Sequence, residues 1–493
     1  MGSARGLIDH LHSPLARGHS PAGAFTGAAG GAACGDIVRI SVAIEARSPD
    51  GRVEDAGFDA RGCGATLAAG SAAVSLVHGR PLLAAARIGA REIADELGGL
   101  SPAKQHAAEL AADALHRALG WAARERCSLA PREERTLVAM SGGVDSAVAA
   151  LLLARDGGEA VGVTLELWSD PENDGELSCC SAQAVRGARA LAHELQMPHL
   201  SIDLRAEFRA GVVEHWLADH AAGLTPNPCV RCNGNVRLDA MLGLADRLGA
   251  QWLATGHYAR VGGERESAAP SCPAGPLLRV AADTAKDQSY VLAALSPSSL
   301  ARLRFPLGEM HKHEVRELAR RSGLAVARRR DSQDLCFLAG TRQRVFLERH
   351  GGLGERRGAI VDRAGALLGE HPGAHAFTVG QRHGLGIGGG TPLYVLATDT
   401  LSNTVTVGPR EALAASTITV RELTLRRPSA WVNGVRVRSH GRLSGCRLAD
   451  PLEAGAHPHA TLVLERPAER TAPGQIACLY HDELLVGHGA IAA

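Results

Sequence analysis

A glycine-rich turn with hydroxyl and carboxyl side chains carries the clearest chemical signal in this sequence: Ser141-Gly142-Gly143-Val144-Asp145-Ser146. Residues 136–140 before it are apolar, as in a buried strand, and residues 147–153 after it begin a helical pattern. Glycines let backbone N–H groups approach an anion closely, and a helix start favours negative charge. No Gly-Lys-Ser/Thr closes the turn, so it differs from the Walker loop. We expect a phosphate site here rather than an ordinary glycine-rich turn.

Three cysteines in two separate motifs are candidate sulfur nucleophiles. Cys229 and Cys232 have CxxC spacing within TPNPCVRCN (residues 225–233), just before a predicted helix, and Cys336 lies in DSQDLCF (331–337). A helix start and the neighbouring Arg231 are expected to lower a thiol pKa and favour the thiolate. A further motif, DTAKDQSY (283–290), contains Lys286, which is notable because the whole chain has only three lysines.

Five separated motifs together resemble one enzyme family. TPNPCVRCN, ATGHYAR, KDQSY, DSQDLCF and TVGQRHGLGIGG match, in type and order, the tRNA-specific 2-thiouridylase family over roughly residues 135–493. SGGVDS resembles the loop of the ATP pyrophosphatase enzymes, which cleave ATP between the α and β phosphates and adenylate a carbonyl oxygen. The resemblance implies an ATP- and Mg²⁺-dependent sulfurtransferase that replaces the C2 oxygen of the wobble uridine of tRNA.

The resemblance also implies roles for single residues. Cys336 would carry the incoming persulfide, and Cys232 would be the nucleophile that pairs with it. The residues implied to line the ATP site are Ala139, Met140, Ser141, Gly142, Gly143, Val144, Asp145, Ser146, Leu165 and Gly256. Those implied to contact tRNA are Asn227, Pro228 and Cys229 beside the target base, and His257, Lys286, Asp287, Gln288, Arg438, Ser439 and Gln475.

The route of the sulfur stays open at this stage. Attack by the Cys232 thiolate on the persulfide would release hydrosulfide and leave a Cys232–Cys336 disulfide, or the persulfide itself would attack the activated base. Some family members have Asp where this chain has Cys229. Three thiolates would also be enough to hold an iron–sulfur cluster with one iron left to bind hydrosulfide. A mere packing role for Cys229 is the third reading.

An N-terminal unit resembles the IscU/NifU type of iron–sulfur scaffold. Cys34, Asp36, Cys63 and His106 match its ligand positions, but residue 107 is Ala where a third cysteine is expected. Such mixed ligands suit Zn²⁺ or a labile cluster, and a degenerate docking module is the alternative. Cys127 would replace the missing ligand only if the chain folded back. Both resemblances concern proteins supplied by a cysteine desulfurase, so we expect a desulfurase or sulfur-relay protein as partner, with the fusion raising the local donor concentration.

The composition limits the possible classes of function and the possible location of the protein. A net charge of +1 over 493 residues does not mark a nucleic-acid binder, although a balanced chain can still have a basic face. The sequence shows no apolar run of about 18 residues and no signal-peptide pattern, so we expect a cytoplasmic protein without membrane contact. Eleven cysteines in that compartment favour reactive or metal-binding thiols. Rival functions are a small-molecule ligase with the same loop and a sulfur carrier with a vestigial one.

The elements that position these residues divide the chain into five parts. We expect a multidomain protein: an α+β scaffold-like domain (1–125), a linker (126–135), an α/β parallel-sheet ATP domain (136–344), a small central domain (345–409) and an antiparallel β-barrel (410–493). In the ATP domain the predicted strands are 136–140, 160–167, 199–204 and 252–260. The predicted helices are 146–155, 181–195, 205–221 and 233–249. Ligands of such sheets bind at the carboxyl ends of the strands, where SGGVDS lies.

Overall fold

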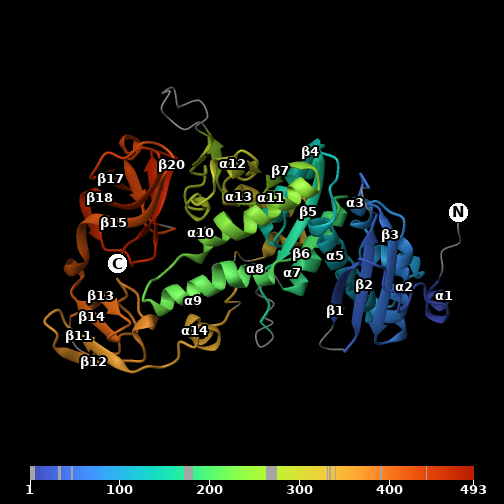
Figure 1. Ribbon diagram of the computed structural model, residues 1–493, viewed down its shortest axis with the longest axis horizontal. Helices are drawn as coiled ribbons and strands as arrows, with labels where there is room; N and C mark the ends of the chain where they lie inside the picture. The colour runs from blue at the N-terminus through green and yellow to red at the C-terminus, as the bar shows by residue number, and fades with distance from the viewer. Residues whose placement is uncertain are drawn as a thin grey trace.

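The described residues form four β-sheets (Figure 1). The computed structural model describes residues 6–30, 35–45, 48–170, 181–262, 275–329, 331, 335–338, 340–388, 391–439 and 441–493. None of the helices within these ranges is long and apolar enough to cross a membrane. The multidomain architecture expected from the sequence is confirmed.

The first sheet is antiparallel and belongs to the N-terminal unit. Its order is β1 (Phe25–Gly30), β2 (Ile37–Ile44) and β3 (Val53–Arg61). The hairpin of β2 and β3 was expected from alternation, whereas the Gly/Ala-rich β1 gave no such signal. Helix α2 is built of small residues and packs closely on β3, since a Cβ on Gly70 would lie 2.4 Å from the Phe58 ring. The helices here are α1 (Leu7–His12), α2 (Gly64–Val77), α3 (Leu82–Ala85), α4 (Ala90–Glu96) and α5 (Gln105–Glu125).

The second sheet is fully parallel and has the order β10-β7-β4-β5-β6. From the central β4 the chain first adds strands on one side and later on the other. The carboxyl ends of β4 and β7 therefore flank the switch point, where open α/β sheets bind ligands. The strands are β4 (Arg132–Ala139), β5 (Glu159–Glu166), β6 (His199–Asp203), β7 (Ala250–Ala254) and β10 (Leu303–Arg304).

Two long helical runs of this domain each contain a π-helical segment. One run joins α8, η2 and α9, and the other joins α10, η3 and α11. Such π segments often lie at functional sites. The helical elements are α6 (Val144–Arg155), α7 (Ala182–Glu194), α8 (Arg205–Phe208), η2 (Arg209–Val213), α9 (Glu214–Ala221), α10 (Pro228–Cys232), η3 (Asn233–Arg237), α11 (Leu238–Arg247), α12 (Pro297–Leu300), α13 (Lys312–Arg321) and α14 (Gln343–Gly351). Short 3₁₀ turns are η1 (Pro102–Lys104), η4 (Tyr290–Leu292), η5 (Ala325–Arg328), η6 (Ala374–Ala376), η7 (Arg410–Leu413) and η8 (Ser429–Trp431).

Helix α5 fastens the N-terminal unit to this parallel sheet. It lies across β6 so closely that a Cβ on Gly120 would be 2.0 Å from the Ser201 carbonyl oxygen. The ring of His116 sits between the carbonyl oxygens of Ile88 and His199, 2.8 Å from each. One continuous hydrophobic core runs from the first sheet through α5 into the second. The N-terminal unit is thus part of the same packed body and is not merely tethered to it (Figure 1).

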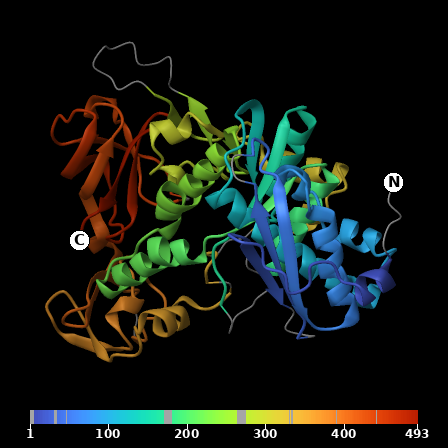
Figure 2. The ribbon, with the colours of Figure 1, turned by 45° about the vertical axis from the view of Figure 1, so that its right-hand side comes forward.

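The C-terminal part holds a small sheet and a closed barrel at the end of the molecule away from the N-terminal unit (Figure 2). Six antiparallel strands close in the cycle β15-β18-β17-β16-β19-β20, because β15 also pairs with β20. Strands β8 (Arg260–Gly262) and β9 (Leu277–Arg279) lie in the chain between strands of the parallel sheet, yet they extend the barrel at β20. The small sheet contains β11 (Gly358–Val361), β12 (Leu367–His371), β13 (Tyr394–Asp399) and β14 (Thr404–Gly408). The barrel strands are β15 (Ala414–Leu425), β16 (Gly434–Arg436), β17 (Ser444–Leu448), β18 (Gly455–Glu469), β19 (Ile476–His481) and β20 (Leu484–Ile491).

Candidate active site and metal site

The predicted phosphate loop lies between the end of β4 and the start of α6. Gly142 has φ +71°, a conformation that favours glycine, and Gly143 caps α6 with extended backbone. The Ser146 hydroxyl accepts from the backbone N–H of Ser141 and donates to the carbonyl of Gly143, both at 3.1 Å. The loop is thus fixed by its own side chain, with the first turn of α6 free to present N–H groups to an anion.

Gly256 follows β7 and lies directly against this loop. A Cβ there would be 2.7 Å from the backbone nitrogen of Ser146, so a larger residue would displace the first turn of α6. The segments that follow the two strands at the switch point therefore meet through glycine and backbone.

One cavity joins the cysteines to the phosphate loop. It measures about 240 Å³, and Cys229, Cys232 and Cys336 all line it. Met140, Ser141, Leu165, His257 and Gln288 line the same cavity. Residues that lie more than a hundred positions apart in the sequence thus face a single space. An electrophile activated at the phosphate loop would lie within the same space as the thiols.

The CxxC segment forms the first turns of a helix and does not merely precede one. The Asn227 side chain accepts from the backbone N–H of Cys229 at 3.1 Å, and Pro228 occupies the first helical position. The expectation that Arg231 lowers the thiol pKa is wrong for Cys229. The Arg231 guanidinium donates to the Gly211 carbonyl at 2.7 Å, and burial raises the pKa of Cys229.

Two neutral polar side chains complete the cavity wall. His257 contacts the Thr255 hydroxyl through Nδ1 at 2.8 Å, and burial lowers the pKa of His257 to about 3. The imidazole is therefore uncharged near neutral pH. The backbone N–H of Gln288 donates to the Tyr258 carbonyl, and the side-chain Oε1 of Gln288 accepts from the Tyr258 backbone N–H. These hydrogen bonds hold both side chains in place on the wall of the cavity, where they can contact a bound group.

Three other residues expected to contact tRNA, Lys286, Asp287 and Arg438, are not among the residues that line this cavity. Lys286 is 40 % exposed and pairs with Asp331 at 2.9 Å, and Arg438 is exposed. Asp287 is buried, and its carboxylate binds Arg436 of β16 at 2.6 Å and the Ser289 hydroxyl at 2.7 Å. Its contacts are thus internal and connect the KDQSY segment to the barrel.

A second, larger groove lies between α9, α10 and the barrel strands β15 and β20. It measures about 550 Å³, and Asn227 and Pro228 line it. Gln475 lies beside it and donates to the Thr225 carbonyl at 2.5 Å. Ser439 is half-buried after β16. Pro228 lines both spaces, so α10 is the wall between the cavity and the groove.

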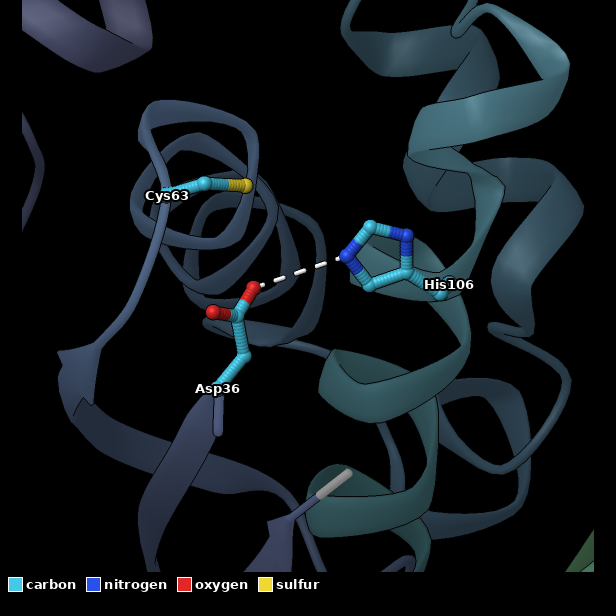
Figure 3. Close-up of side chains that lie close together, drawn as sticks. All are labelled: Asp36, Cys63 and His106. Carbon is cyan, nitrogen blue, oxygen red and sulfur yellow. Dashed lines mark ion pairs between the residues drawn. The ribbon is translucent and has the colours of Figure 1, made fainter. Parts of the chain in front are cut away.

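The N-terminal unit brings three of its four predicted ligands together (Figure 3). Asp36, Cys63 and His106 place their ligand atoms within 4.8 Å of one another, and His106 Nε2 lies 3.5 Å from Asp36 Oδ2. Thr66 donates to Asp36 at 2.5 Å and lies 3.4 Å from the Cys63 sulfur. Cys34 lies outside the described residues.

The orientation of His106 suits a metal ligand. Its Nδ1 lies 3.0 Å from the Ala103 carbonyl and must carry the proton to donate there. Nε2 is then the ring nitrogen that faces Asp36, and it is buried without a hydrogen-bond partner. Burial raises the pKa of Cys63, but hydrogen bonding to Thr66 outweighs it, so the pKa falls below its ordinary value. The donors therefore fit a thiophilic cation such as Zn²⁺ or iron.

Among the described residues, the structure offers no replacement for the cysteine that is missing at position 107. Ala107 is fully buried in α5. Cys127 lies at the other end of that helix, about 30 Å from His106 at 1.5 Å per residue. Its sulfur packs near Gly51, and burial raises its pKa to about 11. The site thus has three described ligands.

Comparison with known proteins agrees with this two-part construction. The bifunctional protein NifU/MnmA of Rubrobacter xylanophilus is 42 % identical over 99 % of this chain and 98 % of its own length. The chain belongs to the fused NifU/MnmA family. Family models match residues 4–127 (NifU-like N terminal domain), 134–340 (tRNA methyl transferase HUP domain) and 344–409 (tRNA methyl transferase PRC-barrel domain).

Relatives without the NifU part match the remainder. The tRNA-specific 2-thiouridylase MnmA of Acidithiobacillus ferrooxidans is 42 % identical over 73 % of this chain and 98 % of its own length. That of Thermobifida fusca is 43 % identical over 73 % of this chain and 95 % of its own length. The resemblance to this family and to the NifU-like scaffold is confirmed.

Sequence reasoning missed Lys312, which lies at the phosphate loop of this NifU/MnmA protein. Its ammonium is 2.7 Å from the Asp145 carboxylate. The available signal was its rarity, because it is one of only three lysines in the chain. It lies outside every motif that the resemblance drew on, and only the packing of α13 against α6 brings it to Asp145.

Proposed function

We propose that this protein is an ATP-dependent tRNA-uridine 2-sulfurtransferase that thiolates the wobble uridine in the cytoplasm. The observation that carries the proposal is that Cys232 and Cys336 line one cavity with Ser141 of the phosphate loop. The names of the MnmA relatives supply the substrate class, tRNA, and the reaction, 2-thiolation.

The reaction needs both halves of this site. A carbonyl oxygen is a poor leaving group, so ATP first transfers AMP to the uridine O2 and releases pyrophosphate. A sulfur nucleophile then adds at C2, and AMP leaves with that oxygen. The phosphate loop holds the nucleotide with Mg²⁺, and the cavity positions the sulfur and excludes water. A wobble base lies in a single-stranded loop and can be splayed out into such a cavity.

The cysteine pair accounts for the sulfur and its electrons. A persulfide on Cys336 carries the transferable sulfur. The Cys232 thiolate attacks the inner sulfur, forming a Cys232–Cys336 disulfide and expelling the outer sulfur as hydrosulfide, which adds at C2. In the other order the persulfide adds at C2 first, and Cys232 then cleaves the S–S bond. Either way a thiol reductant must restore the pair before the next turnover.

An iron–sulfur cluster on the same three cysteines is the second mechanism. Cys229, Cys232 and Cys336 all line the cavity, and the raised pKa of half-buried Cys229 would fall on binding iron. A cluster so held would supply a bound hydrosulfide, and ATP would still activate the base. Iron and sulfide analysis after anaerobic purification separates the two mechanisms, since full activity without iron requires the persulfide.

The NifU-like unit is proposed to receive sulfur or a metal centre from a cysteine desulfurase or sulfur-relay protein. The support is the three-ligand cluster of Asp36, Cys63 and His106 on a unit fixed to the ATP domain. Because the two units share one core, truncation at residue 125 would expose that core. The replacement His106→Ala tests the role without this damage. It should reduce desulfurase-dependent thiolation and spare thiolation with free sulfide.

The decisive assay is thionucleoside analysis of tRNA treated with ATP and a sulfur source. Cys232→Ala and Cys336→Ala should both abolish 2-thiouridine, whereas Cys446→Ala, which changes a buried barrel cysteine, should retain it. Pyrophosphate release should need tRNA and should not be stimulated by small carboxylic acids. Full thiolation by either active-site variant would contradict the persulfide route.

A further inference from the structure

One ammonium group connects the phosphate loop to the segment that carries Cys336. Lys312, the first residue of α13, lies 2.7 and 2.8 Å from the two carboxylate oxygens of Asp145, in the first turn of α6. The same nitrogen lies 2.9 Å from Asp331, five residues before Cys336. The Lys312 side chain is only 12 % exposed, so these contacts are poorly screened by water.

The groups that face this ammonium from neighbouring elements are themselves engaged. Tyr258 donates its hydroxyl to Asp145 at 2.9 Å. Asp331 also binds Lys286 at 2.9 Å and Arg316 at 2.6 Å. Burial raises the pKa of Asp331, but hydrogen bonds from Lys286 and Lys312 outweigh it and hold the pKa at about 2. Asp331 is therefore ionised at neutral pH and is shared by three cations, whereas Lys312 alone among them also reaches Asp145.

A second contact joins the same two segments. Arg329 donates from Nη1 to the carbonyl oxygen of Gly142 at 2.9 Å. Arg329 and Asp331, which precede Cys336 by seven and five residues, thus contact the phosphate loop at Gly142 directly and at Asp145 through Lys312.

We propose that Lys312 is a positioning residue that makes the reactivity of Cys336 depend on the nucleotide at the phosphate loop. The inference rests on the proposed function, since it takes ATP as the ligand of that loop. Polyphosphate oxygens beside Asp145 compete for the ammonium, and the accompanying Mg²⁺ competes for the Asp145 carboxylate. Lys312 then leaves Asp331, and this residue, five positions before Cys336, keeps only Lys286 and Arg316 of its three cations. A ligand shifts such an equilibrium only through this differential interaction.

The test uses the full chain and measures two quantities separately. Equilibrium dialysis gives the ATP affinity in the presence of Mg²⁺. Peptide-resolved mass spectrometry gives the rate at which iodoacetamide alkylates Cys336, with and without ATP. In the wild type, ATP should accelerate alkylation of Cys336 by about fivefold or more, the lower end of coupling between two sites.

Variants at the two ends of the bridge identify its cause. In Lys312→Met without ATP, Cys336 should be alkylated as fast as it is in the wild type with ATP, and adding ATP should not change that rate further. Lys312→Arg should restore the ATP effect. Asp331→Asn leaves the contact between Lys312 and Asp145 intact, so it should bind ATP normally and still lose the acceleration. Lys104→Met, at an exposed lysine of η1, is the matched control and should behave as wild type.

The outcomes separate this inference from the proposed function. A wild type that binds no ATP would refute the proposed function. Two results would overturn the role of Lys312 and leave the proposed function standing. One is ATP binding with no change in the alkylation rate of Cys336. The other is an ATP effect on that rate, protection or acceleration, that persists in both Lys312→Met and Asp331→Asn.

Discussion

The ion pair between Arg117 and Glu166 should be a principal determinant of how the NifU-like unit is fixed to the ATP domain. Arg117 of α5 donates from Nε and Nη2 to the two oxygens of Glu166, at the end of β5, at 2.8 and 2.7 Å. The Glu166 side chain is only 7 % exposed. Replacing Arg117 by Met leaves a buried carboxylate without its bidentate partner. Loss of one partner from a buried pair costs about 3–5 kcal/mol of unfolding free energy.

The double replacement tests whether the stability loss comes from the unpaired carboxylate. Arg117→Met combined with Glu166→Leu removes both charges and fills the same space with apolar groups. Because pairing only offsets desolvation, such a swap is often neutral. We expect the double variant to lie within about 1 kcal/mol of the wild type, and so to be more stable than the single variant.

Urea unfolding followed by circular dichroism and by hydrogen exchange of residues 6–125 measures both effects. Since one hydrophobic core spans both units, a single transition should shift in the Arg117→Met variant. The control is Arg91→Met in the exposed pair with Asp95, which should cost about 1 kcal/mol or less. A loss for Arg117→Met as small as that control, or an N-terminal transition that does not move, would refute the reasoning.

Three further predictions concern the sites. Gly256→Ala places a Cβ 2.7 Å from the Ser146 nitrogen, so the ATP affinity measured by equilibrium dialysis should fall about tenfold, as overpacking of about 1–3 kcal/mol implies. Gly243→Ala, whose added Cβ would meet nothing within 4 Å, is the control. Equal ATP affinities of the two variants would contradict the close contact at Gly256. His106→Ala should weaken Zn²⁺ binding by about tenfold or more relative to exposed His78→Ala, and unchanged affinity would remove His106 from the ligands. Because burial depresses the His257 pKa to about 3, the imidazole NMR signals of His257 should not titrate between about pH 5 and pH 8. The stability that the neutral imidazole contributes should be lost as pH falls from about 6.5 towards 3. A titration near pH 6.5 would instead place His257 in solvent.

Much of the site was predictable because local patterns specify it. The phosphate loop needs a strand, glycines and a helix start in direct succession, and these are adjacent in the sequence from 136 to 153. The hairpin of β2 and β3 follows from simple alternation. Asp36, Cys63 and His106 matched scaffold positions one by one, and the structure brings those three together.

What escaped prediction depends on packing between distant segments. Lys312 reaches Asp145 only because α13 packs on α6, and nothing in its neighbours marks that contact. Arg231 stands next to Cys232 in the chain, yet its guanidinium is bound to Gly211 of η2. The attachment of α5 to β6 depends on Gly120, which reads in isolation as a weak point in a helix. Likewise β8 and β9 join a barrel whose other strands lie more than a hundred residues later.

The convergence of two thiols on the nucleotide loop is tested most directly by mapping disulfides after a single turnover. Protein loaded with persulfide is given ATP and tRNA without reductant, quenched in acid and digested under non-reducing conditions. The persulfide account predicts one new cross-linked peptide pair, Cys232 with Cys336, formed in proportion to 2-thiouridine. Thiolated tRNA without that pair, or with Cys336 joined to a different cysteine, would contradict it.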